Sequence, residues 1–232
     1  MSGYFVTGTD TGVGKTLVSC ALLRALAARG LEVVGMKPVA AGAQHEDGRL
    51  VNDDVTALRA ASSVKAPAHL VNPYCFAPAI APHVAAAKAG VSISLDRIKT
   101  AYAGLAALAE CVIVEGAGGF EVPLGPDYST SDLAAKLELP VILVVGMRLG
   151  CLSHALLTAR AVAGSGLRLA GWVANHIDRD MPCAQENVDA LGSRLPAPLL
   201  ARIPWTRDAA SPEVARLLGA AVEKLEYARR RR

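Results

Sequence analysis

The sequence predicts an α/β fold in which a mostly parallel β-sheet is flanked by helices on both faces. Short apolar runs rich in β-branched residues alternate with alanine- and leucine-rich stretches of helical length, which is the pattern of βαβ units. The 232 residues, 52% of them hydrophobic, are enough to bury one sizeable core. No repeat, low-complexity block or linker divides the chain. We therefore expect a single domain over residues 1–232.

The elements follow one another in βαβ order. A strand at Tyr4–Thr7 leads into a helix over Lys15–Ala28, which Gly30 is expected to cap before a second strand at Leu31–Met36. Lys37-Pro38 ends that strand. The same patterns predict helices at Asp53–Ala61 and Leu95–Ala109, and strands at Cys111–Val114, Val141–Val145, Leu169–Ala174 and Leu199–Ile203. The proline-bearing stretch 64–90 fits a substrate loop, a lid or a long connection, and the sequence does not choose among them.

Charge and composition argue against several classes of protein. Arg229–Arg232 supply four positive charges of a formal net charge of +3, so the rest of the chain sums to −1 and does not indicate nucleic-acid binding. We expect this basic tail to be a solvated, frayed end. The most apolar run, Pro140–Met147, is far shorter than the roughly 20 residues that span a bilayer, and it predicts a buried strand.

Cysteines and histidines are scattered along the sequence. The five cysteines are odd in number and never form a C-x-x-C pair, which argues against both a disulfide framework and a zinc site. The strand-and-loop motif begins within a few residues of Met1, leaving no room for a signal peptide. We expect a protein of the reducing cytoplasm, with no role at a membrane.

A glycine-rich stretch between the first strand and the first helix predicts a phosphate-binding loop. It reads Gly-Thr-Asp-Thr-Gly-Val-Gly-Lys-Thr from Gly8 to Thr16. Small residues let backbone N–H groups point at phosphate oxygens, and the helix N-terminus adds partial positive charge. Lys15 is expected to bridge the terminal phosphates and Thr16 to offer a hydroxyl to Mg²⁺. Thr9 stands where the general pattern has glycine, so the loop is a variant. The expected nucleotide contacts here are Gly12, Val13, Gly14, Lys15, Thr16 and Leu17.

Charged residues at other strand ends complete the predicted phosphate site. Glu115 ends a buried strand and precedes the small residues Gly116, Ala117 and Gly118, which suit close approach to a phosphate. Lys37 brings a second cation to the same sheet edge, as phosphoryl transfer requires. Asp54 is favoured as a further magnesium ligand, with Asp53 as the cap of the next helix.

A polar cluster after another predicted strand, Asn175-His176-Ile177-Asp178, resembles the N-K-x-D base-reading loop of GTP-binding proteins. His176 replaces its lysine, so guanine specificity is not indicated. An asparagine amide can also pair with the edge of adenine. We expect Asn175 to contact the base, the alternative being a plain turn asparagine.

Together these segments resemble the dethiobiotin synthetase family of the P-loop NTPase superfamily, over nearly the whole chain. The likeness is carried by Gly8–Thr16, Gly35–Val39, Asn72–Tyr74, Pro82-His83, Val114–Gly119, Leu149–Cys151, Gly171–Asn175, Pro196–Leu200 and Ile203–Trp205. The resemblance implies a ligase of biotin biosynthesis. Such an enzyme converts 7,8-diaminononanoate, CO₂ and the co-substrate ATP to dethiobiotin, ADP and phosphate. It requires Mg²⁺ and proceeds through a carbamate and a phosphorylated carbamate before a cyclic urea closes.

The resemblance also implies residue roles. Thr11, Lys15 and Lys37 would surround the carbamate and γ-phosphate, and Thr16, Asp54 and Glu115 would hold magnesium. The resemblance further implies a homodimer, in which residues of one subunit contact the tail of the substrate bound by the other. The base would be received by Asn175, His176, Pro204, Trp205 and Thr206, and the substrate tail by Gly150, Cys151 and Leu152. Ala41 stands where the family often has serine or threonine, so one hydrogen bond to substrate is expected to be missing.

Two rival functions share the predicted fold. A ParA-like positioning ATPase carries a signature lysine five residues before the loop lysine, where this chain has Asp10. A cobyrinate-type amide-forming synthetase usually brings a glutaminase domain, for which the chain is too short. Both are therefore less favoured than the dethiobiotin synthetase reaction.

Overall fold

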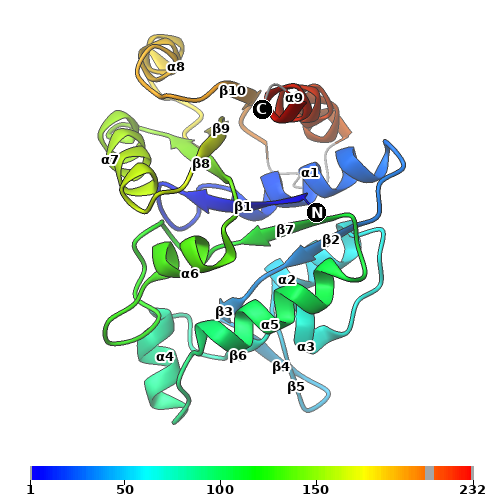
Figure 1. The fold of residues 1–232 in the computed structure, drawn as a ribbon. Helices are drawn as coiled ribbons and strands as arrows, with labels where there is room; N and C mark the ends of the chain where they lie inside the picture. The colour runs from blue at the N-terminus through cyan, green and yellow to red at the C-terminus, as the bar shows by residue number, and fades with distance from the viewer. Residues whose placement is uncertain (1, 207–211, 231–232) are drawn as a thin grey trace.

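A six-stranded parallel sheet forms the centre of the computed structural model, which describes residues 2–206 and 212–230 (Figure 1). The strand order is β10-β9-β8-β1-β7-β2. Its strands are β1 (Ser2–Gly8), β2 (Val33–Met36), β7 (Cys111–Glu115), β8 (Val141–Met147), β9 (Leu169–His176) and β10 (Leu199–Ile203). Two small sheets pair β3 (Val39–Ala41) in parallel with β6 (Tyr74–Phe76), and β4 (Gln44–Glu46) in antiparallel with β5 (Arg49–Val51). The predicted mostly parallel sheet is confirmed.

Helices cover both faces of this sheet, as predicted. They are α1 (Lys15–Ala27), α2 (Asp53–Ala61), α3 (Ala68–Val71), α4 (Pro82–Lys88), α5 (Leu95–Ala106), α6 (Thr130–Leu137), α7 (Cys151–Gly164), α8 (Ala184–Gly192) and α9 (Pro212–Arg230). Successive strand residues point to opposite faces, so neighbours in β1 enter different cores. Val6 packs with residues of α1, α2 and α9, whereas Phe5 packs with residues of α5, α6 and α7. The strands are buried on both sides, and their carboxyl ends meet at one edge.

Several predicted boundaries need correction. Helix α1 has Ala28 as its C-cap, and Gly30, with φ +85°, follows in the closing turn, where Leu31 N–H donates to the Leu26 carbonyl. Strand β2 begins at Val33, two residues later than predicted, because that turn uses the residues before it. The helix predicted over Leu95–Ala109 ends at Ala106, since its apolar pattern continues into a turn. Helix α2 and strand β10 have the predicted bounds.

The predicted cap of α2 is wrong. Asn52, in an extended conformation with φ −122° and ψ 133°, is the N-cap, and its side chain accepts a hydrogen bond from Val55 N–H. Asp53 is the first helical residue. Asparagine and aspartate are equally good caps, so their order in Asn52-Asp53 could not be decided from composition.

The stretch 64–90 is an ordered connection that contains α3, β6 and α4. Pairing of β6 with β3 carries its later part back to the carboxyl edge of the main sheet. Gly42 N–H donates to the Pro78 carbonyl at 3.1 Å, which fixes this part against the loop after β3.

Helix α9 extends to Arg230, so it includes the first two arginines of the basic tail, while Arg231 and Arg232 lie outside the described residues. None of the described helices is long and apolar enough to cross a membrane.

Candidate active site

The phosphate loop lies between the end of β1 and the start of α1, and its shape depends on glycine. Gly12 has φ +75° and Gly14 has φ +91°, a region that side chains rarely adopt. A Cβ on Gly14 would come within 2.2 Å of the Asn175 amide nitrogen. That nitrogen donates to the Val13 carbonyl at 2.8 Å. Asn175 therefore holds the loop in place, while the structure gives its amide oxygen no hydrogen bond among the described residues.

Lys15 is folded back on its own loop. Its ammonium donates to the Asp10 carbonyl at 2.9 Å, and the residue is only 7% exposed. Burial and the nearby Lys37 charge lower the pKa of Lys15 to about 8. The Lys15 ammonium is therefore held within the loop that is predicted to bind phosphate.

Asp10 is part of the loop's support. Its carboxylate accepts from Thr11 N–H at 2.7 Å and from the Arg148 guanidinium at 2.6 Å. The backbone hydrogen bond from Thr11, together with the Arg148 charge, lowers the pKa of Asp10 despite some desolvation. Sequence reasoning missed Arg148, which lies 138 residues from Asp10 and carries no motif of its own.

Four predicted residues from four segments meet in one buried network. Lys37 Nζ lies 2.8 Å from Asp54 Oδ2 and 2.5 Å from Glu115 Oε1. Thr16 Oγ1 lies 2.7 Å from Asp54 Oδ1 and 2.9 Å from Glu115 Oε1. Lys37 is 5% exposed and Glu115 fully buried. The loop after β2, the start of α2, the end of β7 and the start of α1 thus converge, as predicted.

Mutual pairing keeps these groups charged. Burial disfavours the Lys37 cation, but attraction by Glu115 and Asp54 outweighs it and raises the pKa of Lys37. Burial likewise disfavours the Asp54 anion, but Lys37 outweighs it and lowers the pKa of Asp54. In water-poor surroundings such charges are costly unless they are matched. A lysine therefore bridges the two predicted magnesium ligands.

The oxygen atoms in this network fit a magnesium ion. The Thr16 hydroxyl lies within 2.9 Å of one oxygen of Asp54 and one oxygen of Glu115. Glu115 Oε2 is buried without a hydrogen-bond partner among the described residues. Mg²⁺ takes hard oxygen ligands and usually needs only one or two carboxylates beside phosphate oxygens. The described residues contain no cluster of three or more His, Cys, Asp or Glu side chains that could hold a metal.

A cavity of about 720 Å³ opens over this network, a volume typical of small-molecule sites. Predicted residues that line it are Thr11, Gly12, Gly14, Lys15, Thr16, Lys37, Ala41, Asp54, Glu115, Ala117 and Gly118. Sequence reasoning missed Ala79, Ile80, Ala81 and Val122 as lining residues, and it placed Val39 and Pro82 only in the resemblance. The proline-rich composition of the stretch 64–90 marked the segment but not which residues reach the cavity.

Other predicted site residues do not line the cavity. Val13 is buried beneath the loop. Leu17 packs against the hydrophobic core that α1 covers, and Gly116 lies against the Phe5 ring. The base-contact candidates gather at the neighbouring strand ends, because Asn175 and Ile203 are register partners and Pro204 follows directly. The Arg179 guanidinium lies 5.6 Å from the Trp205 ring centroid. The roles of Asn175, His176, Pro204, Trp205 and Thr206 in binding a base stay predictions.

The three predicted tail contacts lie apart from the cavity. Gly150 is the N-cap of α7, with φ +94°, and Cys151 and Leu152 are in its first turn. Leu149 just before them is 94% exposed. Their proposed contact with substrate needs a second subunit and stays a prediction.

Two asparagines missed as site residues hold the loop after β2. The Asn72 amide donates to the Lys37 carbonyl at 2.6 Å and to the Tyr74 carbonyl at 2.9 Å. The Asn52 amide donates to the Ala41 carbonyl at 3.3 Å. Asn72 stood in the resemblance without a role, and nothing in the local sequence indicates its contact with Lys37, which lies 35 residues earlier in the chain.

Solved structures with a similar fold are nucleotide-dependent ATPases. A ParA family ATPase from Chlorobium tepidum TLS superimposes with a TM-score of 0.56 at 15% identity, over 98% of this chain and 93% of that one. The septum site-determining protein MinD of Pyrococcus horikoshii OT3, complexed with Mg-ADP, gives 0.53 at 19% identity, over 96% and 88%. At such low identity these likenesses show the fold alone.

Sequence relatives are much closer. Residues 2–213 match the family model described as an AAA domain. The ATP-dependent dethiobiotin synthetase BioD of Aromatoleum aromaticum is 55% identical over 91% of this chain and 94% of its own length. The enzyme of the same name from Nitrosospira multiformis is 53% identical over 93% and 94%. With its phosphate loop and buried charged network in one cavity, the chain belongs to the ATP-dependent dethiobiotin synthetase family.

Proposed function

We propose that this protein is an ATP-dependent dethiobiotin synthetase, a ligase of biotin biosynthesis. It joins 7,8-diaminononanoate and CO₂ into the cyclic urea of dethiobiotin and converts ATP to ADP and phosphate. The observation that carries the proposal is the position of Lys37, buried between Asp54 and Glu115 beside the phosphate loop. The 55% identity to a named synthetase supports the same reaction.

The reaction divides into three bond-forming steps. One amine of the substrate attacks CO₂ to form a C–N bond and loses a proton, giving a carbamate. A carbamate oxygen then attacks the γ-phosphorus of ATP, and the bond from that phosphorus to ADP breaks. The second amine attacks the carbamate carbon, its C–O bond to phosphate breaks, and the ring closes with release of phosphate and a proton.

The chain's own cations stabilise negative charge in these steps. Lys15 and the backbone N–H groups of the loop receive the transferring phosphoryl group, whose oxygens carry the developing charge. Lys37 lines the same cavity and orients the carbamate, together with the hydroxyl of Thr11 in the loop. Because no covalent enzyme intermediate forms, positioning and electrostatics supply the catalysis.

Magnesium would be held by Thr16, Asp54 and Glu115, whose oxygens converge. When bound, it neutralises phosphate charge and orients the terminal phosphates. The Asn175 amide nitrogen is engaged by Val13, so the amide oxygen is the atom proposed to accept from the adenine amino group. His176 and Pro204–Thr206 complete the proposed base site.

We also propose a homodimer in which Gly150, Cys151 and Leu152 meet the substrate tail bound by the other subunit. The 94% exposure of Leu149 and the 58% exposure of Leu157 on α7 support an interface there, because such large apolar side chains favour burial. All five cysteines are free, which supports the proposed cytoplasmic location.

A coupled assay tests the function. Purified protein with Mg²⁺, ATP and bicarbonate should release phosphate only when 7,8-diaminononanoate is added, with dethiobiotin detected by mass spectrometry in equal amount. Phosphate release at the same rate without the diamine would contradict the proposal and favour a simple ATPase. A variant Lys136→Ala, which changes a surface lysine paired with Asp96, serves as a control for handling and folding.

A further inference from the structure

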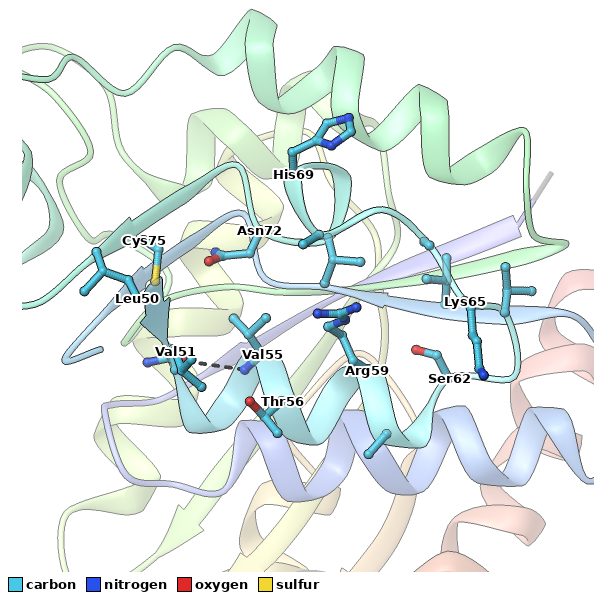
Figure 2. Close-up of a pocket in the computed structure, with 17 residues that line it drawn as sticks. Leu50, Val51, Val55, Thr56, Arg59, Ser62, Lys65, His69, Asn72 and Cys75 are labelled. Atoms are coloured by element: carbon cyan, nitrogen blue, oxygen red, sulfur yellow. Dashed lines mark hydrogen bonds between the residues drawn. The ribbon is translucent and has the colours of Figure 1, made fainter. Parts of the chain in front are cut away.

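A second cavity, of about 580 Å³, lies beside α2 and shares no lining residue with the cavity of the candidate active site (Figure 2). Its volume is within the range of small-molecule sites. The walls come from α2, α3, the end of β5 and the stretch 62–66. Most of its lining is aliphatic: Val34, Leu50, Val51, Val55, Ala60, Val64, Ala66, Ala68 and Val71. None of its lining residues has a role in the reaction proposed above.

One cation points into this apolar space. Figure 2 shows the Arg59 side chain rising from α2 toward the segment that carries Asn72, whereas the His69 ring points outward and Lys65 runs beside Ser62. The structure gives Arg59 no hydrogen bond or ion pair with any described residue, and no lining residue of the cavity is acidic. An arginine fork without a partner is suited to a carboxylate.

We propose that this cavity binds a small aliphatic acid with one negative charge. Arg59 pairs with the carboxylate, and the aliphatic walls receive the chain. The lining holds no aromatic ring on which a nucleotide base could stack, and only one cation is directed inward, so a singly charged aliphatic ligand fits better than a nucleotide or a polyphosphate.

The occupant would touch side chains that hold the catalytic loop. Asn72 and Asn52 line this cavity, and their amides donate to the carbonyls of Lys37 and Ala41. Val55 and Arg59 face the second cavity from the same helix whose first turn carries Asp54 toward the active site. The two cavities therefore share a wall, and we propose that occupancy of one changes turnover in the other.

Calorimetric titration with octanoate tests the binding. Octanoate should bind the native enzyme at least about tenfold more tightly than octanol, because a charge-assisted hydrogen bond contributes about that factor. Arg59→Gln should weaken octanoate binding about tenfold. Arg160→Gln, which removes an exposed arginine from α7 on the opposite face of the sheet, should leave it unchanged. Equal affinity of the native enzyme and Arg59→Gln would overturn the proposal.

Cys75 reports where octanoate binds, because it lines the second cavity and is half-buried. Saturating octanoate should slow its alkylation by iodoacetamide at least about threefold, but leave the exposed Cys183 unaffected, as followed by mass spectrometry. Binding heat without protection of Cys75 would place octanoate elsewhere and overturn the assignment.

Steady-state kinetics distinguish an effect that octanoate exerts from the second cavity from competition in the active site. At saturating 7,8-diaminononanoate, which overcomes competition in the active site, octanoate should still change kcat in the native enzyme and not in Arg59→Gln. Purely competitive inhibition that persists in Arg59→Gln would overturn the coupling. These measurements of binding remain decisive if the proposed reaction fails, since the second cavity does not depend on it.

Discussion

The two cavities beside α2 differ in whether their charged side chains are paired. In the candidate active site Lys37 pairs with Asp54 and Glu115 within 2.8 Å, and both Lys37 and Glu115 are almost withdrawn from water, whereas Arg59 in the second cavity is exposed and has no partner among the described residues. Paired buried charges cannot be removed singly without leaving a desolvated partner. We therefore expect the charges of the candidate active site to support the fold as well as the proposed catalysis, while the Arg59 charge is available to a ligand.

Loss of Lys37 should produce the largest effect. Lys37→Ala leaves Asp54 and Glu115 facing each other without a counter-ion, and we expect the free energy of unfolding to fall by about 3 kcal/mol. The kcat should fall by about 10²-fold or more, because a positioned cation is lost. Urea unfolding and steady-state kinetics measure both, with Lys136→Ala as the control. Full turnover in Lys37→Ala would contradict the proposed role of this residue as a positioned cation.

The variant Asn72→Ala tests whether the wall shared by the two cavities positions the loop that carries Lys37. Asn72→Ala removes the hydrogen bonds to the Lys37 and Tyr74 carbonyls, and the expected cost is about 1–3 kcal/mol in unfolding free energy. We expect kcat to fall about tenfold because the Lys37 loop is less well positioned. Asn187→Ala, which loses one exposed bond to the Cys183 carbonyl, is the matched control and should keep native kcat. Equal kinetics in the two variants would contradict a positioning role for Asn72.

Arg148 supports the phosphate loop from an exposed position. Arg148→Gln should raise the KM for ATP several-fold and leave kcat nearly unchanged, because Asp10 keeps its bond to Thr11. The folded pKa of Asp10 is lowered, so its contribution to stability is complete above the ordinary value of 3.8 and is lost as pH falls through the lower folded value. Acid unfolding of the native enzyme and the variant should therefore differ at moderately acidic pH and converge at lower pH. Curves separated by the same amount throughout would contradict this.

The variant Ala41→Ser tests whether the loop after β2 contacts the diamine substrate. It lines the cavity, and a serine there would restore a hydroxyl that the family often carries. Ala41→Ser should change the KM for 7,8-diaminononanoate by about twofold to fivefold, the effect of one solvent-accessible hydrogen bond. A large fall in kcat would show that this loop does not receive the diamine.

Arg59 provides the contrasting case. Because its charge has no partner among the described residues, Arg59→Ala should change the unfolding free energy by no more than about 0.5 kcal/mol. Thermal unfolding in buffer without organic acids measures this. Destabilisation as large as that of Lys37→Ala would show that Arg59 is part of the folded network.

The sequence predicted the part of the fold that rests on local pattern. Buried strands and the phosphate loop have strong periodic and glycine signals, and parallel strand ends bring Lys37 and Glu115 to one edge. It did not predict Asn52 as the cap of α2, since two good capping residues are adjacent. Arg148 and Asn72 were missed as site residues because their bonds join segments whose proximity only the tertiary structure defines.

The lysine between the two carboxylates gives the polypeptide a counter-ion of its own. We therefore expect a newly made chain to close its core around Glu115 without first capturing a divalent cation, because the Lys37 ammonium balances this buried carboxylate. Folding would then proceed independently of the cell's supply of magnesium and nucleotide.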